Sequence, residues 1–126
     1  MRKDIQRILD AILSQDGVFS YWNQKTKTKG EDPDEYVVYY LNSQYTDFSA
    51  DNEDWKENRR ATVIYFYRDS MLFTSDSRNT VERRINLIRN AFKSEKYRVV
   101  DFDGGEIQQD GYLTTIFEIE RWKIHA

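Results

Sequence analysis

Residues 59–68, RRATVIYFYR, are rich in β-branched and aromatic side chains, which favour an extended strand. Successive side chains of a strand point to opposite faces, so Ile64 and Phe66 share one face. Tyr65 and Tyr67 share the other face. A sheet with helices on one face is ordinarily polar on the other, but both faces of this strand are apolar or aromatic. We therefore expect the second face to be covered as well, by contact with another subunit.

Two other segments repeat this two-sided pattern. The segment 36–48, YVVYYLNSQYTDF, is rich in strand formers and is predicted to be one long strand. The segment 112–122, YLTTIFEIERW, alternates in the same way and is predicted to be the last strand. A short aromatic run at 18–22, VFSYW, is a further strand. The polar segment 49–58, with the embedded Trp55, is predicted to connect the two long strands.

The last strand is expected to form a hairpin with YRVVDF, residues 97–102. Asp110-Gly111 is a preferred type I′ turn pair and closes this hairpin. Gly104-Gly105 is predicted to form a β-bulge within it. The hairpin thus completes a sheet of about five strands.

Two amphipathic helices flank the long strands. The first is predicted near residues 2–15, with Gly17 as its C-terminal stop. Its apolar side chains recur at helical spacing and are Ile5, Ile8, Leu9, Ile12 and Leu13. The second helix is predicted near residues 80–96, where Asn79 and Glu82 resemble a capping box.

The predicted elements follow the order α-β-β-β-α-β-β in 126 residues, the length of one ordinary domain. We expect an α+β fold in which both helices pack on one face of a mainly antiparallel sheet. Residues 1–126 form a single domain in this interpretation. The sequence shows neither an internal repeat nor a second domain.

The composition restricts the class of protein. The net charge is −3, so no overall positive field attracts the chain to nucleic acid or to anionic lipid. The chain has no cysteine, which excludes disulfides and thiolate sites and fits a reducing compartment. The N-terminus, MRKDIQRILDAIL, is amphipathic rather than continuously apolar, so we expect neither a signal peptide nor a membrane span. These features predict a cytoplasmic protein.

A polar segment at about 23–35 interrupts the pattern of helices and strands. Its first half is basic and its second half is acidic, and the charged residues of interest are Lys25, Lys27, Lys29, Glu31 and Asp32. The nearly balanced charge argues against a nucleic-acid arm, and too little structure precedes the segment for a domain linker. We expect a mobile loop. Two interpretations remain: a functionally neutral loop in water, or a loop that becomes ordered on a partner protein.

No catalytic constellation can be assembled from this sequence. The only histidine, His125, is the penultimate residue, and the common nucleotide-binding, metalloprotease and hydrolase motifs do not occur. Asp101, Asp103 and Glu106 faintly resemble a calcium loop, but a bulged hairpin is the better interpretation. Glu118 lies on a predicted strand and belongs to a solvated face. We expect neither enzymatic activity nor a cofactor or metal.

The second face of the sheet is the predicted functional surface. Tyrosine and tryptophan are enriched in protein–protein interfaces, where they anchor the contact. The residues assigned to the face that the helices leave uncovered are Tyr36, Tyr40, Tyr65, Tyr67, Tyr112 and Trp122. Tyrosines that merely line a solvated face, or that a loop covers, are the alternative. We favour subunit contact because two helices cannot cover both faces.

The layout resembles the small tail-terminator, or tail-completion, proteins of long-tailed bacteriophages and prophages. The resemblance covers nearly the whole chain and rests on the order of the elements, the size of the protein and the residue pattern of its segments. It is carried by the amphipathic N-terminal helix, the long polar loop and three segments: DEYVVYYLNSQYTDFSADNEDWKENRRATVIYFYRDS, NTVERRINLIRNAFKSEKY and the closing GYLTTIFEIER. No family motif maps onto single residues, so the interface candidates rest on the sequence pattern.

The resemblance implies a structural protein without catalytic residues. Such a protein assembles as a ring, hexameric in the family, on the last ring of the tail tube, stops tube polymerisation and presents a surface to the head–tail connector. Its implied partners are its own copies, the major tail-tube protein and the connector or neck protein, with no membrane and no sequence-specific nucleic acid. It is then found in the host bacterial cytoplasm during assembly and afterwards in the virion tail. The alternatives are a neck or minor tail protein of similar fold, or a small ligand-binding or enzymatic domain with a pocket lined by Tyr65, Tyr67 and Trp122.

Overall fold

The structure, a computed structural model, describes residues 2–23, 33–42, 45–48, 55–107 and 111–125. Side chains are described for these residues except in the strand segments 45–48, 55–58, 105–107 and 122–125. Several predicted interface residues lie outside the described residues, namely Lys25, Lys27, Lys29, Glu31 and Asp32, and so does the side chain of Trp122.

The fold is α+β, as the sequence predicts, with one mixed and largely antiparallel sheet. Its strands run in the spatial order β1-β2-β4-β6-β5, and β3 pairs with the outer part of β4. Among the described strands, only β1 runs parallel to its neighbour. The strands are β1 Phe19–Trp22, β2 Glu35–Leu41, β3 Tyr45–Phe48, β4 Trp55–Arg68, β5 Arg98–Ile107 and β6 Tyr112–His125.

Two predictions about the strands are wrong in detail. The segment 36–48 forms two strands, β2 and β3, so the element order is α-β-β-β-β-α-β-β. Trp55 does not lie in a polar connection but begins β4, which has 14 residues. Both errors have the same cause, since the pairing of β3 with β4 gives a strand to a polar segment that local propensity assigns to a connection.

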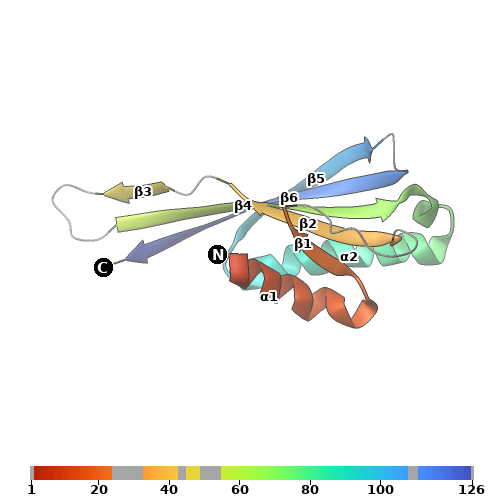
Figure 1. Ribbon diagram of the computed structural model, residues 1–126, viewed down its shortest axis with the longest axis horizontal. Helices are drawn as coiled ribbons and strands as arrows, with labels where there is room; N and C mark the ends of the chain where they lie inside the picture. Colours follow the sequence, from red (N-terminus) through yellow and green to blue (C-terminus); the bar gives the residue numbers. More distant parts are fainter. Residues whose placement is uncertain (1, 24–32, 43–44, 49–54, 108–110, 126) are drawn as a thin grey trace.

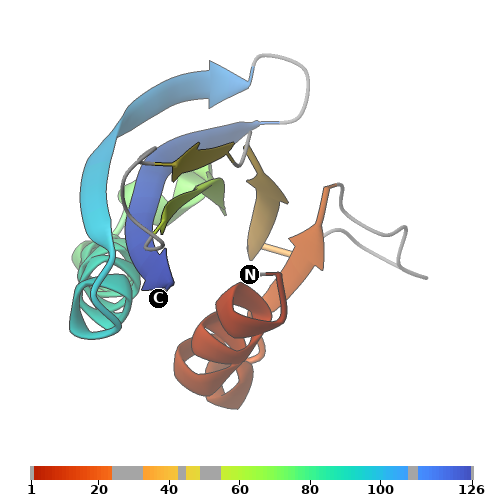
Figure 2. The same cartoon turned by 90° about the vertical axis from the view of Figure 1, so that its left-hand side faces the viewer.

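The helices pack on one face of the sheet, as predicted (Figures 1 and 2). Helix α1, Arg2–Leu13, continues into a 3-10 turn that ends at Gly17, whose φ of 72° suits a residue without a Cβ. Helix α2, Ser75–Ser94, begins where the Thr74 side chain accepts a hydrogen bond from the Ser77 amide. The predicted capping box is therefore wrong, and α2 starts four residues before Asn79.

The main core lies between the helices and the sheet. The apolar stripe of α1 packs against alternate residues of β2, β4 and β6, and α2 adds its own stripe from the side of β5 and β6 (Figure 2). The fully buried large side chains are Tyr39, Tyr65, Phe92, Phe117, Ile5, Leu9, Leu13, Ile88, Ile119, Val37 and Val63. One continuous core of this kind is the mark of a single domain.

The bulge predicted at Gly104-Gly105 is confirmed. The register of β5 against β6 shifts between Asp103 and Gly105. A Cβ on Gly104 would stand 2.2 Å from Oγ1 of Thr114, so the close approach of the two strands requires a glycine there. Gly111 has a φ of 71°, as a tight hairpin turn requires, but residues 108–110 lie outside the described part of the chain and the turn type stays a prediction.

The long strands extend past the helices at one end of the molecule. Strand β3 and the parts of β4 and β6 that pair with it or beside it project to the left of the body in Figure 1. Strand β5 accompanies β6 only as far as the pair of Arg98 with Glu120. This projection is called the arm below. At the opposite end, β4 leads through the 3-10 turn η2, Asp69–Leu72, into α2.

Candidate protein interface

The face of the sheet opposite the helices, called the open face below, is apolar across its full width. Paired residues of neighbouring strands point to the same side of a sheet. One such row crosses five of the six strands and consists of Tyr21, Val38, Ile64, Ile116 and Phe102. Of the described residues, none forms a second layer over this row (Figure 2). The unusual feature that the sequence predicts, an apolar face without helices, is therefore present.

An aromatic cluster closes part of the open face within the chain itself. The rings of Tyr36 and Phe66 stack with their centroids 4.5 Å apart, and Tyr112 meets Tyr36 edge-on at 5.2 Å. Tyr21 approaches the same ring edge-on at 6.4 Å. The Tyr112 hydroxyl donates a hydrogen bond to the Pro33 carbonyl oxygen, so its polar end is satisfied. Tyr36 and Tyr112 are consequently buried, at 8% and 3% exposure.

The open face is exposed at its two outer strands and towards the arm. Its large exposed apolar side chains are Phe19 at 63%, Val100 at 53%, Phe102 at 46% and Tyr40 at 37%. Ile64 and Ile116 are half-buried between them. Exposed apolar side chains on neighbouring positions of one surface are typical of a site of protein contact.

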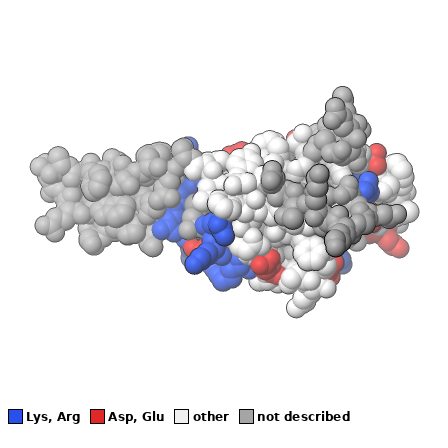
Figure 3. Space-filling view, viewed as in Figure 1, with Lys and Arg blue, Asp and Glu red and all other residues white. Residues whose placement is uncertain are grey.

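A charged row bounds the open face where the arm begins. The Arg60 guanidinium lies 3.0 Å from the Glu120 carboxylate, and Arg98 pairs in register with the same glutamate. These side chains surround an open depression of about 270 Å³, which is lined by Arg60, Arg98, Val100, Glu118, Ile119 and Glu120. Figure 3 shows further Lys and Arg side chains at the border of arm and body, on the side where the N-terminal end of α1 lies. The open face thus has an apolar centre and a charged end, as protein interfaces commonly have.

The sequence-predicted tyrosines divide between the two faces. Tyr36, Tyr40 and Tyr112 lie on the open face, as predicted, although only Tyr40 is exposed. The assignment of Tyr65 and Tyr67 to the open face is wrong, because both belong to the core beneath the helices. Their hydroxyls can be buried there because hydrogen-bond partners are present. Because both rings are buried in the core, Tyr65 and Tyr67 do not line an open pocket, while the alternative of a small ligand-binding or enzymatic domain stays a prediction.

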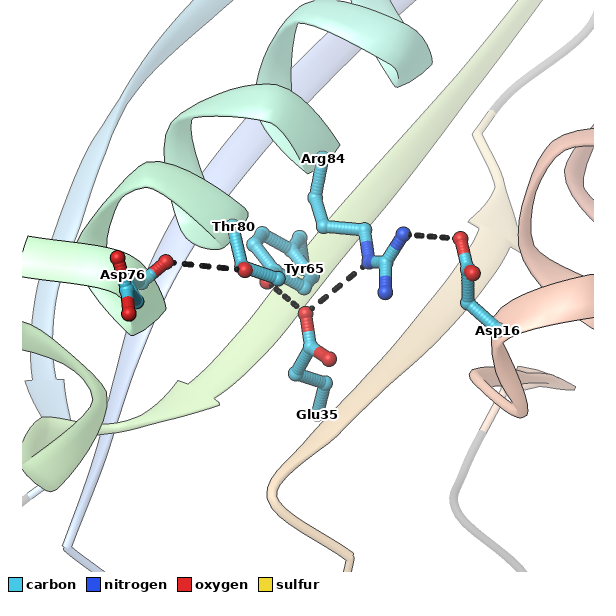
Figure 4. A network of polar contacts seen from close by, with 6 residues as sticks. All are labelled: Asp16, Glu35, Tyr65, Asp76, Thr80 and Arg84. Atoms are coloured by element: carbon cyan, nitrogen blue, oxygen red, sulfur yellow. Dashed lines mark hydrogen bonds and ion pairs between the residues drawn. The ribbon is translucent and has the colours of Figure 1, made fainter.

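A polar network within the helix-covered side explains the burial of Tyr65 (Figure 4). Its hydroxyl donates to Oε1 of Glu35, the first residue of β2, and Arg84 of α2 donates to the same oxygen at 3.2 Å. Arg84 also donates to Asp16, so one guanidinium joins the turn after α1, the helix α2 and strand β2. Glu35 is thus part of β2 and not of the polar loop predicted at 23–35.

The electrostatics of this network favour charged Arg84 and protonated Tyr65. Burial raises the pKa of Tyr65, and the hydrogen bond to the Glu35 carboxylate raises it further. Burial by itself would lower the pKa of Arg84, but the carboxylates of Glu35 and Asp16 outweigh it and raise that pKa. The group has the properties of a structural clamp, since the Tyr65 hydroxyl, Oε1 of Glu35 and two nitrogens of Arg84 all have partners within the fold.

The sequence analysis did not single out Arg84, although the position of this residue within an apolar stripe indicates burial. Arg84 falls three residues after Val81 and four before Ile88, within the apolar stripe of α2. A charged residue at such a position has to find a buried counter-ion. Glu35 and Asp16 are that counter-charge, but they lie 49 and 68 residues away along the chain.

Other kinds of functional site can be considered in the same way. The described part of the chain contains no group of three or more histidine, cysteine, aspartate or glutamate side chains that could hold a metal ion. Within the same residues, neither helix has the length and apolar character that a membrane crossing requires. No protein-family model matches the chain, and no curated protein matches it.

Proposed function

We propose that this chain is a structural protein that works by self-assembly through its open face, as a tail terminator of a long-tailed bacteriophage or prophage. In this role its copies form a ring, hexameric as in the family, on the last ring of the tail tube. The ring stops polymerisation of the tube and offers a surface to the head–tail connector or neck protein. Assembly takes place in the cytoplasm of the host bacterium, and the protein remains in the virion tail.

The single observation that carries the proposal is the open face. It is apolar across five strands, and its exposed members, such as Val100 and Phe102, are accessible to a partner. Burying such side chains stabilises association by roughly 25 cal/mol for each Å² of apolar surface removed from water. The charged row with Arg60 and Glu120 lies at the border of this surface, where it can orient a partner.

Two further features support the assignment to tail assembly. The observed order, α-β-β-β-β-α-β-β, contains the N-terminal helix, the second helix and the closing pair of strands on which the resemblance rests. The polar groups of the helix-covered side, by contrast, are engaged within the fold: Tyr65, Glu35 and Arg84 bind one another. The proposal therefore rests on the exposed apolar surface and not on a group of reactive side chains.

The test uses the tail tubes of the phage or prophage that encodes this chain. The variant combines Val100→Ser with Phe102→Ser, two exposed positions on β5 of the open face. The matched control combines Leu41→Ser with Leu87→Ser, two exposed apolar positions that do not lie on the open face. Tube length is measured by electron microscopy, and folding by circular dichroism.

We expect the control to cap tubes at the wild-type length and the open-face variant to leave overlong tubes while still folded. Truncation of central interface side chains typically costs about 2 kcal/mol or more of association free energy, so two such changes disable a weak ring contact. A folded open-face variant that caps tubes at normal length would show that this surface is not the interface. If the wild type does not bind tube ends but joins the neck, the protein is a neck component.

A further inference from the structure

Most of the charged side chains on the open face are balanced within the chain. At the end of this face near the arm, Arg60 and Glu120 form an ion pair with an N–O distance of 3.0 Å. At the opposite end, Arg68 is paired with Asp34, with an N–O distance of 3.4 Å. These four side chains therefore add no net charge to the surface.

Two further side chains of the open face carry opposite charges and are not paired. Arg98 on β5 and Glu118 on β6 are exposed, and neither forms an ion pair with another described residue. They are diagonal neighbours, because the residue that pairs in register with Glu118 is Val100, two positions after Arg98. Both line the depression at the base of the arm. The surface thus offers one unpaired cation and one unpaired anion, on Cα atoms roughly 7–8 Å apart.

Exposed apolar side chains continue from this charged site along the open face. Val100 and Phe102 of β5 are both exposed, and Ile116 of β6, which pairs in register with Phe102, is half-buried. A partner of this surface must therefore cover apolar side chains and also supply one carboxylate and one cation. A partner with charge of a single sign, such as a nucleic acid, would satisfy Arg98 and leave Glu118 facing a like charge.

A second copy of the chain meets all of these requirements. A two-fold axis that passes midway between Arg98 and Glu118 places Arg98 of each copy opposite Glu118 of the other. The unpaired cation and anion of each copy then give two ion pairs in the dimer, with no net charge left over. Val100 lies close to such an axis and meets its apolar counterpart there. Glu120 also lies close to it, and its charge remains balanced by Arg60 of the same copy.

We propose that the open faces of two copies pack against each other around this axis, and that the resulting dimer is the form of the protein before tail assembly. The contact is isologous, because the same patch of both copies takes part in it. Two copies saturate such a contact, so no further copies can add to it.

The consequence of this dimer for assembly rests on the proposed function. The ring on the tail tube also uses the open face, so the dimer has to separate before its copies enter the ring. Until then it covers the exposed apolar side chains, such as Val100 and Phe102, that would otherwise face water. The dimer thus delays ring formation until a tube end competes for the same surface.

Reversal of the two charges tests the pairing between copies. Arg98→Glu and Glu118→Arg are prepared in the full chain as single variants, as an equimolar mixture of the two single variants, and as a double variant. The matched controls are Arg83→Glu and Glu82→Arg, which reverse exposed charges on α2, away from the open face. Sedimentation velocity over a series of concentrations measures the molar mass, and circular dichroism measures folding.

We expect the wild type and both controls to form a concentration-dependent dimer and nothing larger. Each single variant places two pairs of like charges at the contact and should raise the dissociation constant of the dimer at least about tenfold while still folded. The mixture should dimerise again, because one copy then supplies both carboxylates and the other supplies both guanidinium groups. The double variant should dimerise by itself, since it merely exchanges the two charges.

A wild type that stays monomeric up to its solubility limit would overturn the inference, and so would oligomers larger than a dimer. A dimer that the single reversals leave intact, or a mixture that stays monomeric, would show that Arg98 and Glu118 do not meet across the contact. The proposed function can fail separately. A wild type that dimerises as expected but does not cap tubes would remove the ring and leave the dimer, whereas a monomeric wild type that caps tubes would do the reverse.

Discussion

The two faces of the sheet have similar composition, but their side chains are buried to different extents. On the helix-covered face, Tyr65 and Phe117 are completely buried. On the open face, Phe66 and Ile116 are half-buried, and Phe102 is 46% exposed. Alternation along a strand shows which side chains share a face. It does not show which face the helices cover when both faces are apolar or aromatic. The buried hydroxyl of Tyr65 requires a hydrogen-bond acceptor, and the Glu35 carboxylate provides one on the helix-covered side. Tyr65 can therefore be buried on that side.

A matched pair of phenylalanine variants tests this contrast with the largest expected effect. Phe117→Ala removes a ring from the covered face and should lower the free energy of unfolding by about 3–5 kcal/mol, through lost burial and a residual cavity. Phe102→Ala, on the neighbouring strand but on the open face, should cost about 1 kcal/mol or less. Urea denaturation measures both. Similar losses at the two positions would show that the open face is covered in the isolated chain.

Arg84 tests how far the covered side depends on its polar clamp. Arg84→Met should lower the free energy of unfolding by about 3 kcal/mol, because it leaves Glu35 buried without its counter-charge. Adding Glu35→Gln should recover part of this loss. Arg7→Met removes an exposed pair with Glu95 and should change stability by about 0.5 kcal/mol or less. A comparable effect of Arg7→Met and Arg84→Met in thermal or urea unfolding would contradict the clamp.

The dependence of stability on pH should reveal an ion pair on the helix-covered side of β5. Hydrogen bonds from Arg89 hold the pKa of Asp101 below its ordinary value, with Nη2–Oδ2 and Nε–Oδ1 distances of 2.6 Å and 2.8 Å. A lowered folded-state pKa contributes stability above the unfolded pKa of about 3.9, and this stability is lost as the pH falls through the folded value. Asp101→Asn should therefore destabilise the protein at neutral pH and progressively less below about pH 4. A constant difference between variant and wild type across this range would argue against the pair.

The smallest change in stability is expected where a buried hydroxyl makes no hydrogen bond. The Tyr97 hydroxyl is buried without a hydrogen-bond partner among the described residues, and burial raises its pKa. Tyr97→Phe should be neutral or slightly stabilising, because the ring contacts with Phe92 and Arg121 remain. Tyr65→Phe is the matched control and should cost about 1.5–3 kcal/mol, since it removes a hydrogen bond to a carboxylate. Equal losses for the two variants would mean that Tyr97 also has a partner.

The sequence predicts the parts of this fold that depend on local chemistry. Helix α1 and its stop at Gly17, the strands at 59–68 and 112–122, the bulge at Gly104 and the helices on one face are confirmed. Each depends on a periodic pattern or on a glycine requirement within a few residues. The exact start of α2 is different, because Thr74 and the predicted Asn79 are both acceptable caps and tertiary packing decides between them.

The candidate site could be predicted only in part, because its decisive contacts span long distances in the sequence. The existence of an apolar second face follows from alternation, and Tyr40 was placed on it correctly. The assignment of Tyr65 to that face could be corrected only by its bond to Glu35, 30 residues away.

The bulge at Gly104 has a consequence for the way copies can meet. Strand β5 stands at the border of the sheet, and a regular border strand is a template on which foreign strands can add without limit, as in amyloid. The register shift at Gly104 and the acidic Asp103 beside it interrupt that template. Growth by strand addition, which has no natural end, is thereby discouraged. A border of this kind therefore favours contacts through side chains over open-ended pairing of strands.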